Sequence, residues 1–188
     1  MSKNLYIISG CNGAGKTTAS YTVLPEILDC KEFVNADEIA RGLSPFNPES
    51  MAIEAGRLML KRIEELLEKE ETETTLATKS NINLVHRAQA KGYTVSVLFF
   101  WLRTPDLAIQ RVAERVQNGG HNIEEDVIKR RYVAGITNLF GLYMQEVDYW
   151  DIYDNSENPR KQIACGGKDS DTIIKEELLF SKIQSYVK

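Results

Sequence analysis

The segment GCNGAGKT, residues 10–17, constrains this chain more than any other part of its sequence. It fits the pattern G-x-x-x-x-G-K-[ST] in full, follows the β-rich residues 5–9 and precedes a stretch that can start a helix. Glycines let such a loop wrap closely around phosphate oxygens. The N–H groups of the loop and of the helix N-terminus then face the anion. The sequence therefore predicts a nucleoside triphosphate site between a strand and a helix.

Each part of this loop has an expected role in binding ATP and Mg²⁺. Lys16 is expected to neutralise the β- and γ-phosphates, and the Thr17 hydroxyl to ligate Mg²⁺. Cys11 occupies a free position of the pattern; it is either a redox-sensitive thiol or simply a small residue tolerated there, and we favour the second interpretation. The expected ATP-binding residues are Gly10, Asn12, Gly13, Ala14, Gly15, Lys16, Thr17 and Thr18.

Strand and helix patterns alternate along the chain. Strands are expected at residues 5–9, 32–34, 72–76, 93–102 and 149–154, with a short edge strand at 161–165. Helical patterns lie between these strands, and the last one covers residues 173–187. The segment YTVSVLFFWL, residues 93–102, is apolar on both faces, as a covered parallel strand requires. The alternation predicts a single α/β domain over residues 1–188, with a mainly parallel sheet covered by helices.

Composition and charge argue against several classes of protein. Of the 188 residues, 43% are hydrophobic and 27% are charged, which is ordinary for a soluble globular domain. The net charge of -4 argues against a nucleic-acid surface, which normally needs clustered positive charge. The three cysteines lack metal-ligand spacing, and the most apolar stretch is far shorter than a bilayer span. We expect a cytoplasmic protein that binds neither nucleic acid nor a membrane.

Carboxylates that follow predicted strands are candidates for the chemistry, because ligands of such sheets bind beyond the carboxyl ends of the strands. Asp37 has two interpretations: it caps the helix that begins there, or it accepts the proton of an attacking hydroxyl. Glu73 and Thr75 lie in ETTL, where a strand could end. They suit a hydroxylated substrate, and a polar turn is the alternative.

A helical hairpin predicted over about residues 105–145 carries several arginines. Arg111 and Arg115 share one helix face, and the run KRR at 129–131 lies beyond the glycine pair at 119–120. Such a hairpin suits a lid that closes over ATP and stabilises charge on the transferring phosphoryl group. A solvated face with ion-pair partners is the alternative for any single arginine.

Four segments together resemble the zeta toxin family of P-loop kinases: IISGCNGAGKTT, FVNADEIARGLSPFNPE, ETTLATKS and WLRTPDLAIQRVAERVQNGGHNI. The resemblance covers about residues 4–155. It implies a kinase-type P-loop fold with the phosphate-binding strand at the centre, and transfer of the ATP γ-phosphate to a hydroxyl. The best-known members phosphorylate the sugar 3′-hydroxyl of UDP-N-acetylglucosamine. An antitoxin-like protein is a further expected partner.

The resemblance implies a role for each matching residue. Lys16 is the phosphate lysine, Thr17 the Mg²⁺ ligand and Asp37 the catalytic base. Glu73 and Thr75 match the substrate-binding E-x-T of the family.

The remaining catalytic candidates are arginines of the lid hairpin. Arg111 lies where a charge-stabilising lid arginine is expected, and Arg115 is the nearby alternative. The chain departs from the family pattern before Glu73, where EKEET replaces an apolar strand, and it is compact. We therefore expect an ATP- and Mg²⁺-dependent small-molecule kinase. The alternatives to a UDP-sugar acceptor are a nucleoside, a sugar or an antibiotic, and the alternative to an enzyme is a non-catalytic, ATP-gated binding module.

Overall fold

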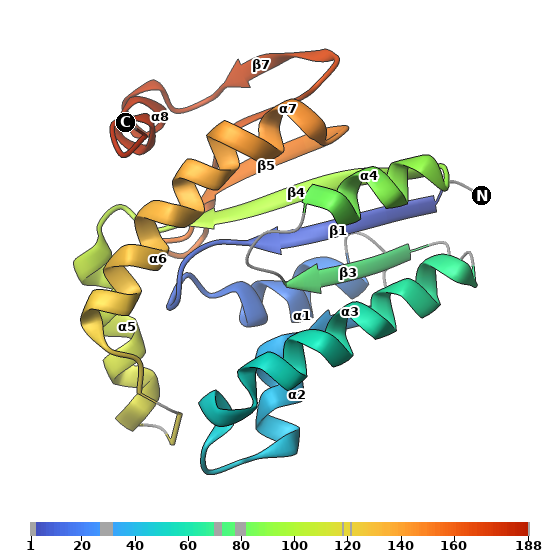
Figure 1. Ribbon diagram of the computed structural model, residues 1–188. Helices are drawn as coiled ribbons and strands as arrows, with labels where there is room; N and C mark the ends of the chain where they lie inside the picture. Colours follow the sequence, from blue (N-terminus) through green and yellow to red (C-terminus); the bar gives the residue numbers. More distant parts are fainter. Residues whose placement is uncertain are drawn as a thin grey trace.

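The computed structural model describes residues 3–26, 32–69, 73–77, 82–117, 119–120 and 122–187. Its centre is a seven-stranded sheet with the order β2-β3-β1-β4-β5-β6-β7 (Figure 1). The first five strands along the chain pair in parallel, whereas β6 and β7 add to β5 as antiparallel strands. The strands are β1 (Lys3–Ser9), β2 (Glu32–Asn35), β3 (Glu73–Ala77), β4 (Tyr93–Trp101), β5 (Tyr149–Asp154), β6 (Lys161–Gly167) and β7 (Ser170–Ile174).

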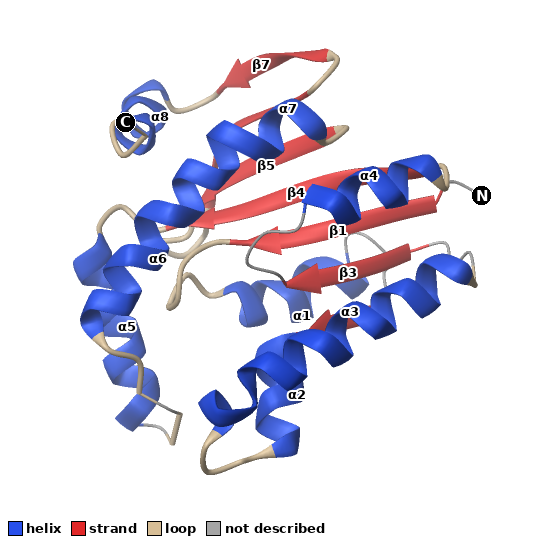
Figure 2. Cartoon of the chain, viewed as in Figure 1, coloured by secondary structure: helices blue, strands red, loops and turns tan. Residues whose placement is uncertain are grey.

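Helices connect the parallel strands and cover the sheet (Figure 2). Among them α3 packs against β2 and β3, α4 against β4, and α7 and α8 against β6. The helices are α1 (Lys16–Glu26), α2 (Ala36–Leu43), α3 (Ala52–Glu68), α4 (Ile82–Ala90), α5 (Pro105–Gln117), α6 (Glu125–Asn138), α7 (Met144–Glu146) and α8 (Glu177–Gln184). A 3-10 turn, η1 (Pro48–Met51), precedes α3, and a π-helical turn, η2 (Leu139–Tyr143), joins α6 to α7.

The core follows the hydrophobic pattern of the sequence. β4 is buried on both faces at its carboxyl end, where Phe99, Phe100 and Trp101 are all at most 2% exposed. On α3 the buried residues recur at helical spacing, as expected for a helix with one apolar face. The structure confirms the predicted α/β fold with a mainly parallel sheet, and it confirms the central position of β1 between β3 and β4.

Two boundaries differ from the sequence prediction. Residues 170–174 form β7, the second strand of an antiparallel hairpin with β6, so the last helix begins at Glu177 instead of residue 173. The segment SDTII has only two apolar residues, so its local pattern does not predict a strand. It becomes one because it pairs with β6, a contact between segments that the local pattern does not reveal. The predicted strand at 161–165 extends to Gly167 as β6 and is not an edge strand, because β7 pairs on its outer side. The strand expected at 72–76 is confirmed to within one residue, since β3 is Glu73–Ala77.

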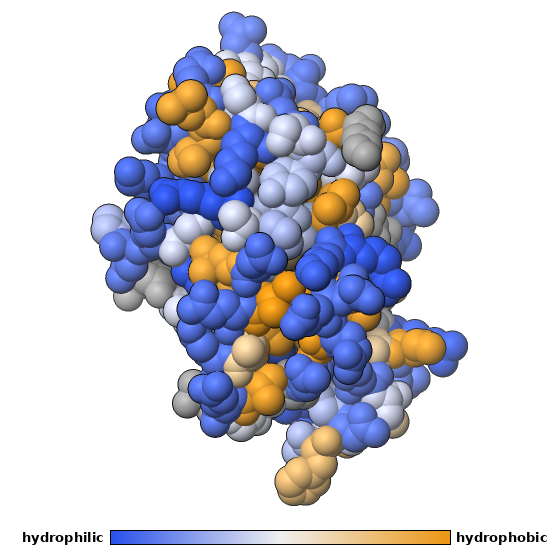
Figure 3. Space-filling view, turned by 90° about the vertical axis from the view of Figure 1, so that its left-hand side faces the viewer, coloured by the Kyte–Doolittle hydropathy of each residue, from blue (hydrophilic) through white to orange (hydrophobic). Residues whose placement is uncertain are grey.

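Because β1 to β5 are parallel, their carboxyl ends meet at one edge of the sheet, on the left in Figure 1. The glycine-rich loop leaves β1 at this edge, and α2 leaves β2 there. Figure 3 views the molecule from this side and shows apolar residues at its centre, ringed by polar ones. An edge of this kind is where ligands of open α/β sheets bind.

Candidate active site

The glycine-rich loop has a backbone that only glycine tolerates at its key positions. Gly10, Gly13 and Gly15 have φ values of 138°, 77° and 76°. A Cβ on Gly10 would lie 2.2 Å from the carbonyl oxygen of Phe100, at the end of β4. The loop is therefore packed directly on the carboxyl edge of the sheet, with its backbone exposed to an incoming anion.

The predicted phosphate residues lie at the start of α1. The ammonium of Lys16 donates hydrogen bonds of 2.8 Å to the carbonyl oxygens of Gly10 and Cys11, so it lies within the curve of the loop. Thr17 is half-buried in the first turn of α1, and Thr18 beside it is exposed. Lys16 is thus positioned to exchange carbonyl oxygens for the oxygens of a phosphate.

Asp37 does not cap α2. The cap is Asn35, a buried residue with extended backbone angles, whose Oδ1 accepts a 2.9 Å hydrogen bond from the N–H of Asp37. Asp37 is the second residue of the helix, and it is exposed. The capping interpretation is wrong, because the side chain before the helix already satisfies that donor. The carboxylate of Asp37 lines a cavity instead.

This cavity, of about 500 Å³, lies between the loop, α2, α3 and α6. Lys16 and Asp37 both line it, together with Arg131 of α6. Met59 and Leu60 of α3 contribute to its apolar walls. A volume of this size suits a small molecule, and its polar groups converge on the loop.

Arg131 is a site residue that the sequence prediction did not select from the KRR run. Its Nη1 donates a 3.2 Å hydrogen bond to the Oδ1 of Asn12 in the loop. The neighbouring Tyr132 is buried; its hydroxyl accepts a 2.8 Å bond from Nε1 of Trp101 and donates a 2.7 Å bond to the carbonyl of Leu102. Burial raises the pKa of Tyr132, so the hydroxyl keeps its proton. The buried tyrosine thereby fixes α6 and holds Arg131 beside the loop.

The two predicted lid arginines have different surroundings. Arg111 donates hydrogen bonds of 2.8 and 2.9 Å to the backbone carbonyls of Asn155 and Ser156, after β5. Arg115 is half-buried, and its pKa is lowered, chiefly by burial, while Asp37 acts to raise it and Arg41 to lower it. Arg115 therefore lies within electrostatic reach of Asp37, whereas Arg111 is bound to a neighbouring loop.

The structure does not bring Glu73 and Thr75 to the loop. Glu73 begins β3 and pairs with Asn4, five residues before Ser9 and so about 17 Å along the strand from the carboxyl edge. Thr75 pairs with Tyr6. Only the backbone of these two residues is part of the described structure, so their predicted substrate role stays a prediction.

The two interpretations of Cys11 differ in the reactivity of its thiol. Burial raises the pKa of the Cys11 thiol to about 11, although Lys16 acts in the opposite direction. A thiol with such a pKa is little ionised near neutral pH, which favours the tolerated small residue over the redox switch.

Within the described ranges no group of three or more His, Cys, Asp and Glu residues could hold a metal ion. In the same part of the chain, no helix combines the length and the apolar character needed to cross a membrane.

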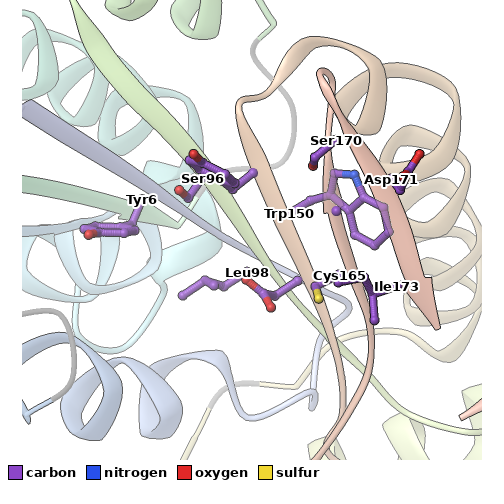
Figure 4. Close-up of a pocket in the computed structure, with 11 residues that line it drawn as sticks. Tyr6, Ser96, Leu98, Trp150, Cys165, Ser170, Asp171 and Ile173 are labelled. Atoms are coloured by element: carbon purple, nitrogen blue, oxygen red, sulfur yellow. The ribbon is translucent and has the colours of Figure 1, made fainter. Parts of the chain in front are cut away.

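A second hollow lies on the sheet itself (Figure 4). It measures about 670 Å³ and is lined from β1, β4, β5, β6 and β7, among others by Tyr6, Leu98, Trp150 and Ile173. Asp151 also lines it and accepts a hydrogen bond from Nε2 of Gln162. Burial raises the pKa of Asp151.

Comparison with known families gives a match that covers most of the chain. The sequence profile of the family described as Zeta toxin matches residues 1–158. An uncharacterised protein of Haemophilus influenzae is 29% identical over 126 residues, which are 65% of this chain and 88% of that protein.

Solved structures show the same fold at low sequence identity. A chain of the AvrRxo1-ORF1:AvrRxo1-ORF2 crystal structure with sulphate ions aligns with a TM-score of 0.76 and 15% identity, over 98% of this chain. A chain from the PezAT toxin-antitoxin system of Streptococcus pneumoniae aligns with a TM-score of 0.66 and 15% identity, over 99% of this chain. The present chain spans 64% of the length of the first and 78% of the second.

Proposed function

The chain belongs to the zeta toxin family, and from this premise we propose that it is a kinase that transfers the ATP γ-phosphate to a hydroxyl of a small molecule. One observation carries the proposal: a single cavity is lined by Lys16 of the glycine-rich loop, Arg131 of α6 and the carboxylate of Asp37. Phosphoryl transfer needs positive charge around the phosphate and a carboxylate that orients the nucleophile. The lining of this cavity supplies both.

On the ATP side, the loop and the N-terminus of α1 would hold the phosphates through backbone N–H groups. The ammonium of Lys16 would leave the carbonyls of Gly10 and Cys11 and bind the β- and γ-phosphates. The Thr17 hydroxyl is a hard oxygen donor of the kind that Mg²⁺ accepts together with phosphate oxygens. Bound there, Mg²⁺ would supply neutralisation of the phosphate charge.

On the acceptor side, Asp37 would accept the proton of the acceptor hydroxyl as its oxygen attacks the γ-phosphorus. The bond from that phosphorus to the β–γ bridging oxygen breaks, and ADP leaves with the charge that Lys16 neutralises. The apolar walls contributed by Met59 and Leu60 would contact the non-reacting part of the acceptor. The exposed position of Asp37 at the cavity is compatible with access of a substrate from solvent.

The acceptor that the family implies is a UDP-activated amino sugar, with Glu73 and Thr75 among the residues that bind it. A nucleoside, a sugar or an antibiotic is the alternative acceptor class. The hairpin of about residues 105–145 would close over the phosphates, because it carries Arg131 beside the loop.

The test is a search for the acceptor itself. Purified protein, ATP and Mg²⁺ are incubated with a metabolite extract, and mass spectrometry identifies any compound that gains a phosphate. UDP-sugars, nucleosides and aminoglycosides are then compared individually by ADP release, with EDTA as the metal-free control. Transfer to one compound supports the kinase. ATP binding without transfer to any compound, combined with ATP-dependent capture of a protein, would favour the binding module.

An antitoxin-like partner stays a proposal of its own. The PezAT neighbour belongs to a toxin-antitoxin system. Co-purification from the source cells, with and without ATP, tests for such a protein. A stoichiometric partner that suppresses phosphate transfer would support it, and an unaffected activity in the presence of every co-purifying protein would contradict it.

A further inference from the structure

We propose that Asn155 is a positioning residue that holds the glycine-rich loop in its phosphate-binding shape, and that Arg111 acts by holding Asn155. This inference rests on the proposed function in one respect: it takes the glycine-rich loop to be a phosphate-binding site. It assigns Arg111 a role different from the phosphate contact expected from the sequence.

Asn155 connects the edge of the sheet to the loop. Its backbone N–H donates a 2.9 Å hydrogen bond to the carbonyl of Trp101, the last residue of β4. Its side-chain Nδ2 donates a 2.8 Å hydrogen bond to the carbonyl of Ala14, inside the loop. Asn155 therefore ties a loop of irregular backbone to the buried carboxyl end of β4.

The bond to Ala14 bears directly on phosphate binding. The carbonyl of Ala14 and the N–H of Gly15 belong to one planar trans peptide, so they point in opposite directions. When Asn155 holds the carbonyl, the N–H of Gly15 is directed away from Asn155, where it is available to an anion. Without this bond the peptide can rotate, and the donor is no longer fixed.

The fit between Asn155 and the loop is close enough to require a glycine. A Cβ on Gly15 would lie 2.6 Å from Nδ2 of Asn155, and the φ of Gly15 is 76°. Both the backbone conformation and the approach of the amide exclude a side chain there. The absence of a side chain at Gly15, directly before Lys16, thus allows Asn155 to contact the loop and also allows a phosphate to approach its backbone.

Arg111 fixes the backbone that carries Asn155. Its two terminal nitrogens donate to two successive carbonyls, those of Asn155 and Ser156, at 2.8 and 2.9 Å. The planar guanidinium holds both carbonyls in one fixed geometry, which the freely rotating ammonium of a lysine would not impose. The helix α5 therefore acts on the loop through Asn155.

The beginning of the same segment is held by an ion pair whose carboxylate is buried. Asp154 is 2% exposed; its Oδ2 accepts a 2.7 Å bond from Nε of Arg103, and its Oδ1 accepts a 2.9 Å bond from the N–H of Ser156. The Ser156 hydroxyl accepts a bond from the N–H of Arg103. A network whose members are all bonded is rigid, so Asn155 is presented in one orientation.

The first experiment measures hydrogen exchange in the glycine-rich loop in the absence of nucleotide. Hydrogen exchange of a peptide covering residues 10–17 is compared between the wild type and Asn155→Ala. We expect exchange in the loop to become about tenfold faster, since a tenfold change corresponds to about 1.4 kcal/mol, a common value for one hydrogen bond. Exchange that does not change in Asn155→Ala would overturn the proposal, whether or not the protein is a kinase.

The second experiment measures ATP binding and turnover. Asn155→Ala should raise the ATP dissociation constant about tenfold and change kcat little, because orientation of a ground-state donor is lost. Asn155→Asp should be at least as harmful, because a carboxylate cannot donate to the Ala14 carbonyl. Glu157→Gln is the control on the same segment: it weakens an exposed ion pair with Arg103, and ATP binding should stay within about twofold.

A double-mutant cycle separates the two roles of Arg111. If Arg111 acts through Asn155, Arg111→Ala combined with Asn155→Ala should weaken ATP binding no more than the stronger single change. Fully multiplicative losses, with a large fall in kcat for Arg111→Ala alone, would mean that Arg111 contacts the phosphoryl group directly and would overturn this role. Thermal unfolding of each variant verifies that the fold is intact.

Discussion

Two cavities of this protein differ in chemistry, and the one at the glycine-rich loop is the candidate active site. The hollow on the sheet measures about 670 Å³, whereas the cavity at the glycine-rich loop measures about 500 Å³. Among the described residues that line the larger one there is no lysine or arginine. Two aspartates line it, Asp151 and Asp171, and burial raises the pKa of Asp151, which favours its protonated form.

The cavity at the loop combines charges of both signs. Lys16 and Arg131 are the cations, and Asp37 is the carboxylate of α2. A triphosphate needs the cations, and an attacking hydroxyl needs the carboxylate. The comparison teaches that the arrangement of charge around a strained glycine backbone identifies the site better than volume does.

The largest expected effect comes from removing the ammonium of the loop. Lys16→Ala should lower kcat/KM for phosphate transfer on the order of 10³-fold, because the charge on the β- and γ-phosphates loses its main partner. Lys175→Ala is the matched change near the hollow, where Lys175 donates to Gln162. A comparable loss of activity in Lys175→Ala would remove the distinction between the two cavities.

A smaller loss is expected for the arginine of α6. Arg131→Ala should lower kcat on the order of 10²-fold, since Arg131 lies at the loop and lines the cavity. The exposed neighbour Arg130 provides the control, and Arg130→Ala should change kcat less than about twofold. Steady-state kinetics of both variants measures the two changes in kcat. Equal effects of the two changes would mean that general surface charge, and no specific contact, is responsible.

The hollow should influence stability without influencing catalysis. Because the folded-state pKa of Asp151 is raised, its contribution to stability is fully present below the unfolded-state pKa and is lost as pH rises through the folded-state pKa. Asp151→Asn removes this loss. The variant should therefore gain in free energy of unfolding, relative to the wild type, between acidic and neutral pH. Denaturant titrations at several pH values measure it, and kcat should not change.

The smallest effect concerns Cys11. With a pKa of about 11, its thiol should react with iodoacetamide at neutral pH far more slowly than a small-molecule thiol, and ATP should slow it further. Cys11→Ser should retain activity within about twofold, because the side chain is a free position of the loop pattern. Peptide mapping after alkylation gives the rate. Fast alkylation of Cys11 at a rate that ATP does not change would contradict the burial of this thiol in the nucleotide-binding loop.

Sequence reasoning succeeded where local chemistry decides the structure. The glycines and Lys16 form a fixed pattern whose backbone consequence is known, and the doubly apolar β4 can only be a covered strand. The alternation of strand and helix patterns likewise predicted the mainly parallel sheet, whereas the central position of β1 was implied by the family resemblance. These features depend on residues close together in the chain.

The details that sequence reasoning missed depend on long-range contacts. Asn35, and not Asp37, caps α2, because the burial that selects between these two polar residues, two positions apart, is tertiary. Arg111 and Arg131 could not be told apart by spacing; Asn155, which binds one of them, is 44 residues distant in the chain. The signal for Arg131 was the buried Tyr132 beside it, in register with Ile128 and Ile136 on the inner face of α6.

The most direct test of the account is Asp37→Asn, measured for transfer of the ATP γ-phosphate to the identified acceptor. Glu38→Gln is the control, since the adjacent carboxylate pairs with Arg41 and does not line the cavity. We predict that Asp37→Asn lowers kcat by about 10²–10⁴-fold with ATP affinity nearly unchanged, and that Glu38→Gln keeps both. Full transfer activity in Asp37→Asn, with the fold intact, would contradict the assignment of Asp37 as the base.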